Sequence, residues 1–254
     1  MKLLVLFLLP LSLFAQLNIV VSYPYIGALT KTIGGDKVNS VVLAKGNWDP
    51  HFIVPRPSLI SKVRNADGLI INTNVNAKTF LNLSQHLHLL HKPHSVSRAD
   101  GDVHPDGNPH FNLDPNNILI LADVIKNYLS SIDSQNTQIY VNNYQTFASQ
   151  WKKKILVWET MMQEKKGMKI IQYHDVLAYF VHAYGLQTVG TIEPLPGIPA
   201  SSKHIMKLIR LVQEENVSSI LHDVYHVTKT AKFIASKTGV PLILMPHDVE
   251  ALDS

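Results

Sequence analysis

Residues 140–162 read YVNNYQTFASQWKKKILVWETMM, and this stretch decides how the chain is organised. Its large apolar side chains recur at steps of 4, 3, 4, 4, 3 and 4 residues, the spacing of one face of an α-helix. They are Tyr140, Tyr144, Phe147, Trp151, Ile155, Trp158 and Met162. The pattern predicts a helix over residues 134–165, which at 1.5 Å per residue would be about 45 Å long. Since no Gly or Pro interrupts the stretch, we expect one stiff helix that joins two domains.

Strand and helix patterns alternate on both sides of this helix. Before it, strands are predicted at 17–22, 38–44 and 68–72, and helices at 24–33, 57–65 and from Asp114-Pro115 onward. After it, strands are predicted at 168–171, 186–191, 217–221 and 241–245, and helices at 175–184, 201–214 and 226–237. Such alternation is typical of parallel sheets flanked by helices. We therefore expect an α/β fold of two small lobes, residues 16–133 and 166–254, with the linking helix between them.

The first 15 residues have the pattern of a signal peptide. Lys2 precedes an apolar run from Leu3 to Phe14, and Ala15 provides a small residue at a plausible cleavage point. The run is shorter than the roughly 20 apolar residues that span a bilayer. The sequence contains no Cys that could carry a lipid. We therefore expect secretion into a Gram-negative periplasm and a soluble mature protein.

The composition directs attention to histidine. The chain has 254 residues, a net charge of +4 and 13 His. The longest basic run, Lys152 to Lys154, lies within the helical pattern and is expected on a solvated face, so we expect no nucleic-acid partner. Without Cys, any bound metal must be held by nitrogen and oxygen ligands.

Three histidines stand where a predicted strand gives way to a loop or helix: His51, His110 and His174. Ligand sites of parallel α/β sheets form at the ends of strands. The separations of 59 and 64 residues are too long for a local metal-finger motif, so these side chains could meet only in a cleft between the lobes. A lone histidine at such a position is more often a turn or core residue.

The segments around these histidines resemble the family of zinc- and manganese-binding receptors of metal ABC transporters. The matching segments are DPH (49–51) with VPRPS (54–58), HPDGNPH (104–110) with LDP (113–115), YHDVLAYF (173–180), EPLPGIP (193–199) and MPHDV (245–249). They occur in the family's order and extend over nearly the whole mature chain. The resemblance implies a periplasmic receptor, expected to be monomeric, that captures a metal ion and delivers it to an ABC permease in the inner membrane.

The same resemblance implies that His51, His110 and His174 bind the metal. Asp248 is the best positional match to the family's acidic fourth ligand; Asp223, His247 or a water molecule are the alternatives. Three imidazoles and one carboxylate suit tetrahedral Zn²⁺. Manganese prefers more oxygen ligands, and manganese-specific members of the family commonly carry a carboxylate at the position of His174. The expected cargo is therefore Zn²⁺.

The sequence leaves alternatives for several polar residues and for the function. Residues His86 to His94 could form a metal-collecting loop or a structured edge with incidental histidines, and His104 belongs to the second motif itself. Asp175 could orient His174 or cap the following helix. A zinc hydrolase is the rival of another class, because three histidines can leave a position for water. No H-E-x-x-H motif or obvious general base accompanies them, so we expect no enzyme; an adhesin or metal buffer of the same fold remains an alternative.

Overall fold

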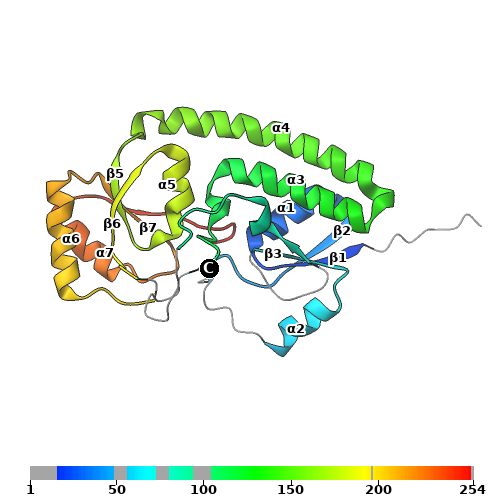
Figure 1. Cartoon of the computed structure of the whole chain (residues 1–254), viewed down its shortest axis with the longest axis horizontal. Coiled ribbons are helices and arrows are strands. Elements are labelled where there is room, and N and C mark those ends of the chain that lie inside the picture. The colour runs from blue at the N-terminus through cyan, green and yellow to red at the C-terminus, as the bar shows by residue number, and fades with distance from the viewer. Residues whose placement is uncertain (1–15, 49–55, 73–79, 94–103, 196, 253–254) are drawn as a thin grey trace, which may run out of the picture.

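The structure is a computed structural model that describes residues 16–48, 56–72, 80–93, 104–195 and 197–252. It forms two lobes, each built on a four-stranded parallel sheet, with one long helix, α4, running across both (Figure 1). The expected α/β architecture of two lobes and a linking helix is confirmed. The expected signal peptide and His51 lie outside the described residues.

The N-terminal lobe has the sheet order β2-β1-β3-β4, and every neighbouring pair is parallel. Its strands are β1 (Leu17–Val21), β2 (Val38–Val42), β3 (Gly68–Ile71) and β4 (Leu81–Asn82), and its helices are α1 (Pro24–Gly34), α2 (Pro57–Arg64) and α3 (Pro115–Ile132). The central strand β1 is rich in β-branched residues, and Ile19, Val20 and Val21 are fully buried. Helix α3 begins as expected, because the Asp114 carboxylate accepts the Asn116 N–H.

Helix α4 (Thr137–Met162) is flanked by single 3-10 turns at Ser134–Asn136 and Gln163–Lys165. All seven members of the predicted apolar stripe are buried or half-buried, which confirms the predicted inward face, whereas Lys152 to Lys154 are exposed. The Trp151 indole N–H donates to the carbonyl of Pro115 at 2.8 Å, and its ring lies between those of Phe147 and Trp158. This contact anchors the middle of α4 to the start of α3.

The C-terminal lobe repeats the arrangement, with the sheet order β6-β5-β7-β8 and parallel pairs. Its strands are β5 (Lys169–Gln172), β6 (Gln187–Thr191), β7 (Ser219–His222) and β8 (Leu242–Leu244), and its helices are α5 (Ala178–Tyr184), α6 (Ser202–Glu214) and α7 (Lys229–Thr238). The lobes are not independent, because Ala178 and Tyr179 of α5 belong to the apolar core of the N-terminal lobe.

Two details differ from the predicted boundaries. Strand β4 has only two residues and was not predicted, since so short an edge strand carries no side-chain alternation. Helix α7 begins at Lys229 and not at His226, because the Asp223 carboxylate accepts the N–H groups of Tyr225 and His226 and holds them in a loop.

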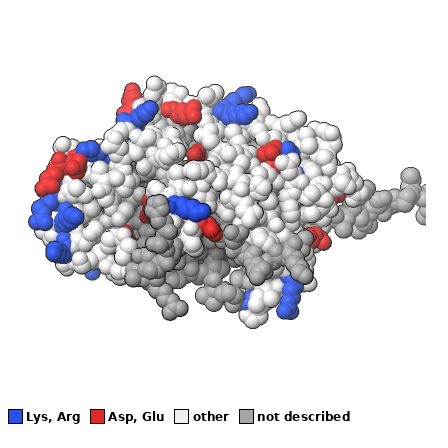
Figure 2. Space-filling model, viewed as in Figure 1, with Lys and Arg blue, Asp and Glu red and all other residues white. Residues whose placement is uncertain are grey.

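Among the described residues, no helix is both long enough and apolar enough to cross a membrane. Figure 2 shows charged side chains in small separate groups, with acidic and basic ones close together over α4 and the C-terminal lobe. Neither sign of charge therefore dominates the described part of this face.

Candidate metal site

The second and third histidine motifs meet at the junction of the lobes. His110 is buried, 7% exposed, and immediately precedes the 3-10 turn η5 (Phe111–Leu113); its backbone N–H donates to the Asn108 side chain at 2.9 Å. His174 follows β5 and precedes the 3-10 turn η8 (Asp175–Leu177), and its side chain is 10% exposed.

Asn108 and Tyr179 bind these two loops to each other. The Asn108 side-chain amide donates to the Asp175 carbonyl at 2.6 Å, and the Tyr179 hydroxyl donates to the Asn108 carbonyl at 2.9 Å. Asn108 is two residues from His110, and Asp175 adjoins His174. The structure therefore brings the His110 loop of one lobe and the His174 loop of the other into direct contact.

Asp248 lies at the first turn of α1. One of its carboxylate oxygens, Oδ1, accepts the N–H of Tyr25 at 2.8 Å and that of Val249 at 2.7 Å. Tyr23, the residue before the helix, makes no side-chain cap. The carboxylate thus satisfies a backbone donor at the positive end of the helix dipole from the opposite end of the sequence.

Burial raises the pKa of the Asp248 carboxyl to about 7, and the charge of Glu250 adds to this effect, while the hydrogen bonds from Val249 and Tyr25 oppose it. A carboxyl with this pKa is only partly ionised near neutral pH, and a neighbouring cation would favour its ionised form.

Two hydrogen-bonded links connect Asp248 to the His110 loop. The Tyr25 hydroxyl donates to the side-chain oxygen of Asn72, whose amide donates to the Pro109 carbonyl at 2.8 Å. The Asn112 amide donates to the carbonyl of His247 at 2.8 Å. Asp248 also lines a cavity of about 730 Å³ between the lobes, together with Tyr25 and Asn112.

The Asp223 carboxylate makes its hydrogen bonds within its own loop. Besides the two backbone N–H groups, its carboxylate contacts the His226 ring nitrogen Nδ1 at 2.9 Å. Burial by itself would raise the pKa of Asp223, but the hydrogen bond and charge of His226 outweigh it, and the pKa is lowered. His247 is buried with its ring against that of Tyr225, at 4.6 Å between centroids.

A carboxylate that was not expected from the sequence lies beside His174. Oxygen Oε2 of Glu193 is 3.7 Å from His174 Nδ1, and the Glu193 side chain is 7% exposed. The Asp175 carboxylate contacts His91 at 2.5 Å and the amides of Asn108 and Gln172 at 3.2 Å each. Asp175 is the first residue of the η8 turn, and Leu177 is the N-cap residue of α5, so Asp175 does not hold the N-cap position of the following helix. The sequence did contain a signal for Glu193: this residue follows the strand predicted at 186–191, and that strand pairs with the one before His174.

The segment with His86, His88 and His91 forms a structured edge within its described part, residues 80–93. These three histidines are exposed, whereas Leu87, Leu89 and Leu90 pack against the N-terminal core. His104 lines a separate cavity of about 200 Å³ with Asp106 and Leu89.

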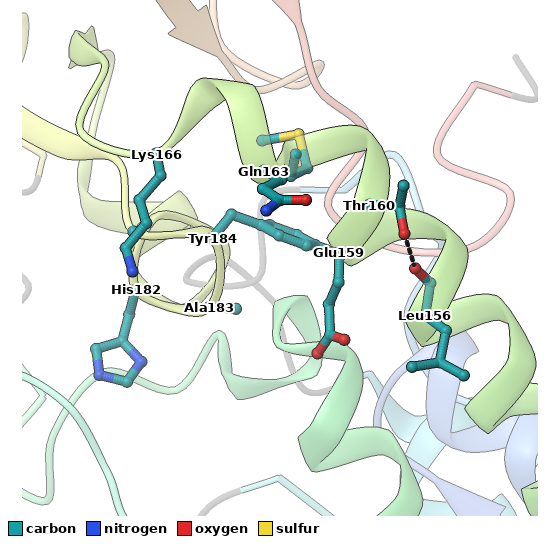
Figure 3. A pocket seen from close by; sticks show the side chains of 10 residues that line it. Leu156, Glu159, Thr160, Gln163, Lys166, His182, Ala183 and Tyr184 are labelled. Atoms are coloured by element: carbon teal, nitrogen blue, oxygen red, sulfur yellow. Dashed lines mark hydrogen bonds between the residues drawn. The ribbon is translucent and has the colours of Figure 1, made fainter.

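Another cavity, of about 570 Å³, lies where the end of α4 meets the end of α5. Its charged side chains and its histidine are Glu159, Lys166 and His182. Figure 3 shows that Glu159 and His182 project from different helices and do not converge on one point. This cavity therefore does not have the donor arrangement of a metal site.

Within the described ranges, no three His, Asp or Glu side chains form a group that could hold a metal ion. A metal-binding site that includes His110 and His174 therefore needs a further ligand. The expected one, His51, is outside those ranges. The chemistry available is nitrogen and oxygen ligation of a divalent cation at a junction of two lobes.

Comparisons with known proteins match this chain to metal-transport proteins. The family described as ZnuA, zinc-uptake complex component A, periplasmic, matches residues 19–253. The manganese ABC transporter substrate-binding lipoprotein PsaA of Streptococcus pneumoniae serotype 4 is 24% identical over 243 residues, covering 89% of this chain and 78% of the relative. The zinc-binding lipoprotein AdcA of S. pneumoniae is 21% identical, covering 89% of this chain and 48% of the relative.

Solved structures show the same fold. A crystal structure of ZnuA superposes with a TM-score of 0.80 at 24% identity, covering 92% of this chain and 93% of the other. FpvC of Pseudomonas aeruginosa, in complex with Mn²⁺, superposes with a TM-score of 0.74 at 18% identity, covering 92% and 89%. Both likenesses support the arrangement of two lobes and a long helix.

Proposed function

This chain belongs to the ZnuA family of zinc-uptake complex components and is a substrate-binding component of a metal ABC transporter, and from this premise we propose that it captures Zn²⁺ in the periplasm and delivers it to an inner-membrane permease. The observation that carries the proposal is the contact between the His110 loop and the His174 loop at the lobe junction. The family consists of receptors and not enzymes, in agreement with the expectation from the sequence.

The proposed ligands are His51, His110 and His174, with Asp248 or a water molecule in the fourth position. Three neutral imidazoles with at most one carboxylate favour Zn²⁺ over Mn²⁺, which prefers more oxygen donors. The named relatives include both a manganese and a zinc receptor, so the choice of zinc rests on the donor set of this chain. Asp248 can serve as a ligand through Oδ2, because both of its hydrogen bonds to backbone N–H groups use Oδ1.

The periplasmic location is proposed from the first 15 residues and from the absence of Cys in the sequence. The curated relatives named above are lipoproteins. Membrane fractionation of cells that express the full chain tests this point: the proposal requires the protein in the osmotic-shock fluid, and its retention with the membranes would contradict it.

The test of the metal site is competitive titration of the purified, metal-free protein with Zn²⁺ and Mn²⁺. We expect one tight Zn²⁺ equivalent and weaker binding of Mn²⁺. The variants His110→Ala and His174→Ala should each lose at least tenfold in Zn²⁺ affinity, about 1.4 kcal/mol. His182→Ala is the matched control, because His182 is exposed and lies at the far end of α5. Unchanged affinity in the His110 variant would overturn the proposed ligand set.

A further inference from the structure

We infer that Glu193 is a positioning residue that accepts the Nδ1–H of His174 and thereby presents Nε2 to the metal. This inference rests on the proposed function, because it assigns a role toward an ion held by His174. It concerns a residue outside the proposed ligand set.

The backbone holds the two side chains next to each other. His174 and Glu193 follow β5 and β6, which are adjacent parallel strands. The pairing continues past both strand ends, since Ile192 N–H donates to the Gln172 carbonyl at 2.9 Å and Glu193 N–H donates to the Tyr173 carbonyl at 2.8 Å. The side-chain approach of 3.7 Å between Nδ1 and Oε2 is therefore a consequence of sheet register and not of a mobile surface loop.

Burial strengthens the effect of this pairing on both side chains. Both side chains are at most 10% exposed, and a buried carboxylate is costly unless a donor is close. The other nearby carboxylate, that of Asp175, faces His91, Asn108 and Gln172. Of the carboxylates adjoining His174 in the described part of the chain, Glu193 is thus the one whose contact is with the imidazole.

The chemistry of metal-bound histidine explains what the contact does. A ligating imidazole usually donates its second N–H to a carboxylate or carbonyl, which fixes the ring orientation and raises its basicity. The Nδ1 to Oε2 distance of 3.7 Å exceeds the usual 2.7–3.2 Å of a hydrogen bond, so the inferred bond requires the two side chains to move closer together. With the proton on Nδ1, the lone pair lies on Nε2, so a metal ion would be bound through Nε2.

The first test is the tautomer of His174 in the metal-free protein, read from long-range ¹H–¹⁵N spectra with assignment by His174→Ala. Wild type should show the proton on Nδ1 when the ring is neutral. The isosteric variant Glu193→Gln should shift this population toward Nε2–H, because its amide can donate to Nδ1. A wild-type ring protonated on Nε2 would overturn the inference, and this measurement does not depend on the folding of any glutamate variant.

The second test is Zn²⁺ affinity. Glu193→Gln should bind Zn²⁺ ten- to a hundredfold more weakly, the usual cost of losing such a partner. Glu215→Gln is the control, since Glu215 is an exposed partner of Lys169 in the same lobe. An affinity loss without a tautomer change, or unchanged affinity, would overturn the positioning role. Failure of wild type to bind Zn²⁺, or tight binding by His174→Ala, would instead refute the proposed function.

Discussion

The variant Tyr140→Phe should destabilise the corner between α3 and α4. The Tyr140 hydroxyl is buried and donates to the Asp133 carboxylate at 2.6 Å, and Asn136 donates to the same oxygen at 2.7 Å. A hydrogen bond to a charged group contributes about 1.5–3 kcal/mol. Because Asp133 is 9% exposed, water cannot readily replace the hydroxyl. We expect the free energy of unfolding to fall by about 2 kcal/mol, within a total of roughly 5–15 kcal/mol.

The loss should depend on pH in a defined direction. Burial alone would raise the pKa of Asp133, but hydrogen bonds from Tyr140 and Asn136 outweigh it, so the folded-state pKa lies below its ordinary value of 3.8. Stability from this group is therefore fully present above pH 3.8 and is lost as the pH falls through the folded-state pKa. The difference between wild type and Tyr140→Phe should be largest near pH 7 and shrink on acidification.

Urea unfolding followed by circular dichroism, at pH 7 and at pH 3, measures both effects. Tyr144→Phe is the matched control on the same helix, because its ring is half-buried and no hydrogen bond to its hydroxyl occurs in the described structure. The slope of the transition should stay constant, which would show that the folded state is otherwise unchanged. An equal loss at both pH values, or a loss in Tyr144→Phe as large as that in Tyr140→Phe, would refute the reasoning.

Three further predictions concern the metal site and the linking helix. Zn²⁺ affinity should weaken below about pH 6, since imidazoles must lose their protons to bind metal; isothermal titration at several pH values checks this, and a flat profile would argue against histidine ligands. Replacing His86 and His88 by Gln should leave the tight Zn²⁺ equivalent intact, because both side chains are exposed while Leu87 between them packs inward; loss of that equivalent would show that the proposed site is misplaced. Small-angle scattering should show little change in radius of gyration on Zn²⁺ binding, because α4 contains no Gly or Pro and is anchored to α3 through Trp151, while α5 of the C-terminal lobe packs into the N-terminal core; a large decrease would contradict a rigid link.

Much of the architecture could be predicted from the sequence because the relevant signals are local. The stripe from Tyr140 to Met162 repeats within one helix, so its inward face follows from spacing alone. The strands and helices of both lobes lie within a few residues of their predicted bounds, and Asp114 caps α3 as expected. The histidine motifs at the ends of strands predicted that His110 and His174 belong to the same region, and the structure joins their loops.

Only the tertiary structure decided which polar groups meet. Asp175 is next to His174 in sequence, yet the carboxylate beside that ring is Glu193, because the pairing of β5 with β6 sets neighbours across strands. Asp248 reaches the first turn of α1 from 223 residues away. Periodicity along a chain records which face of an element is buried, whereas partners across the fold depend on register and on the approach of the lobes, which no local spacing specifies.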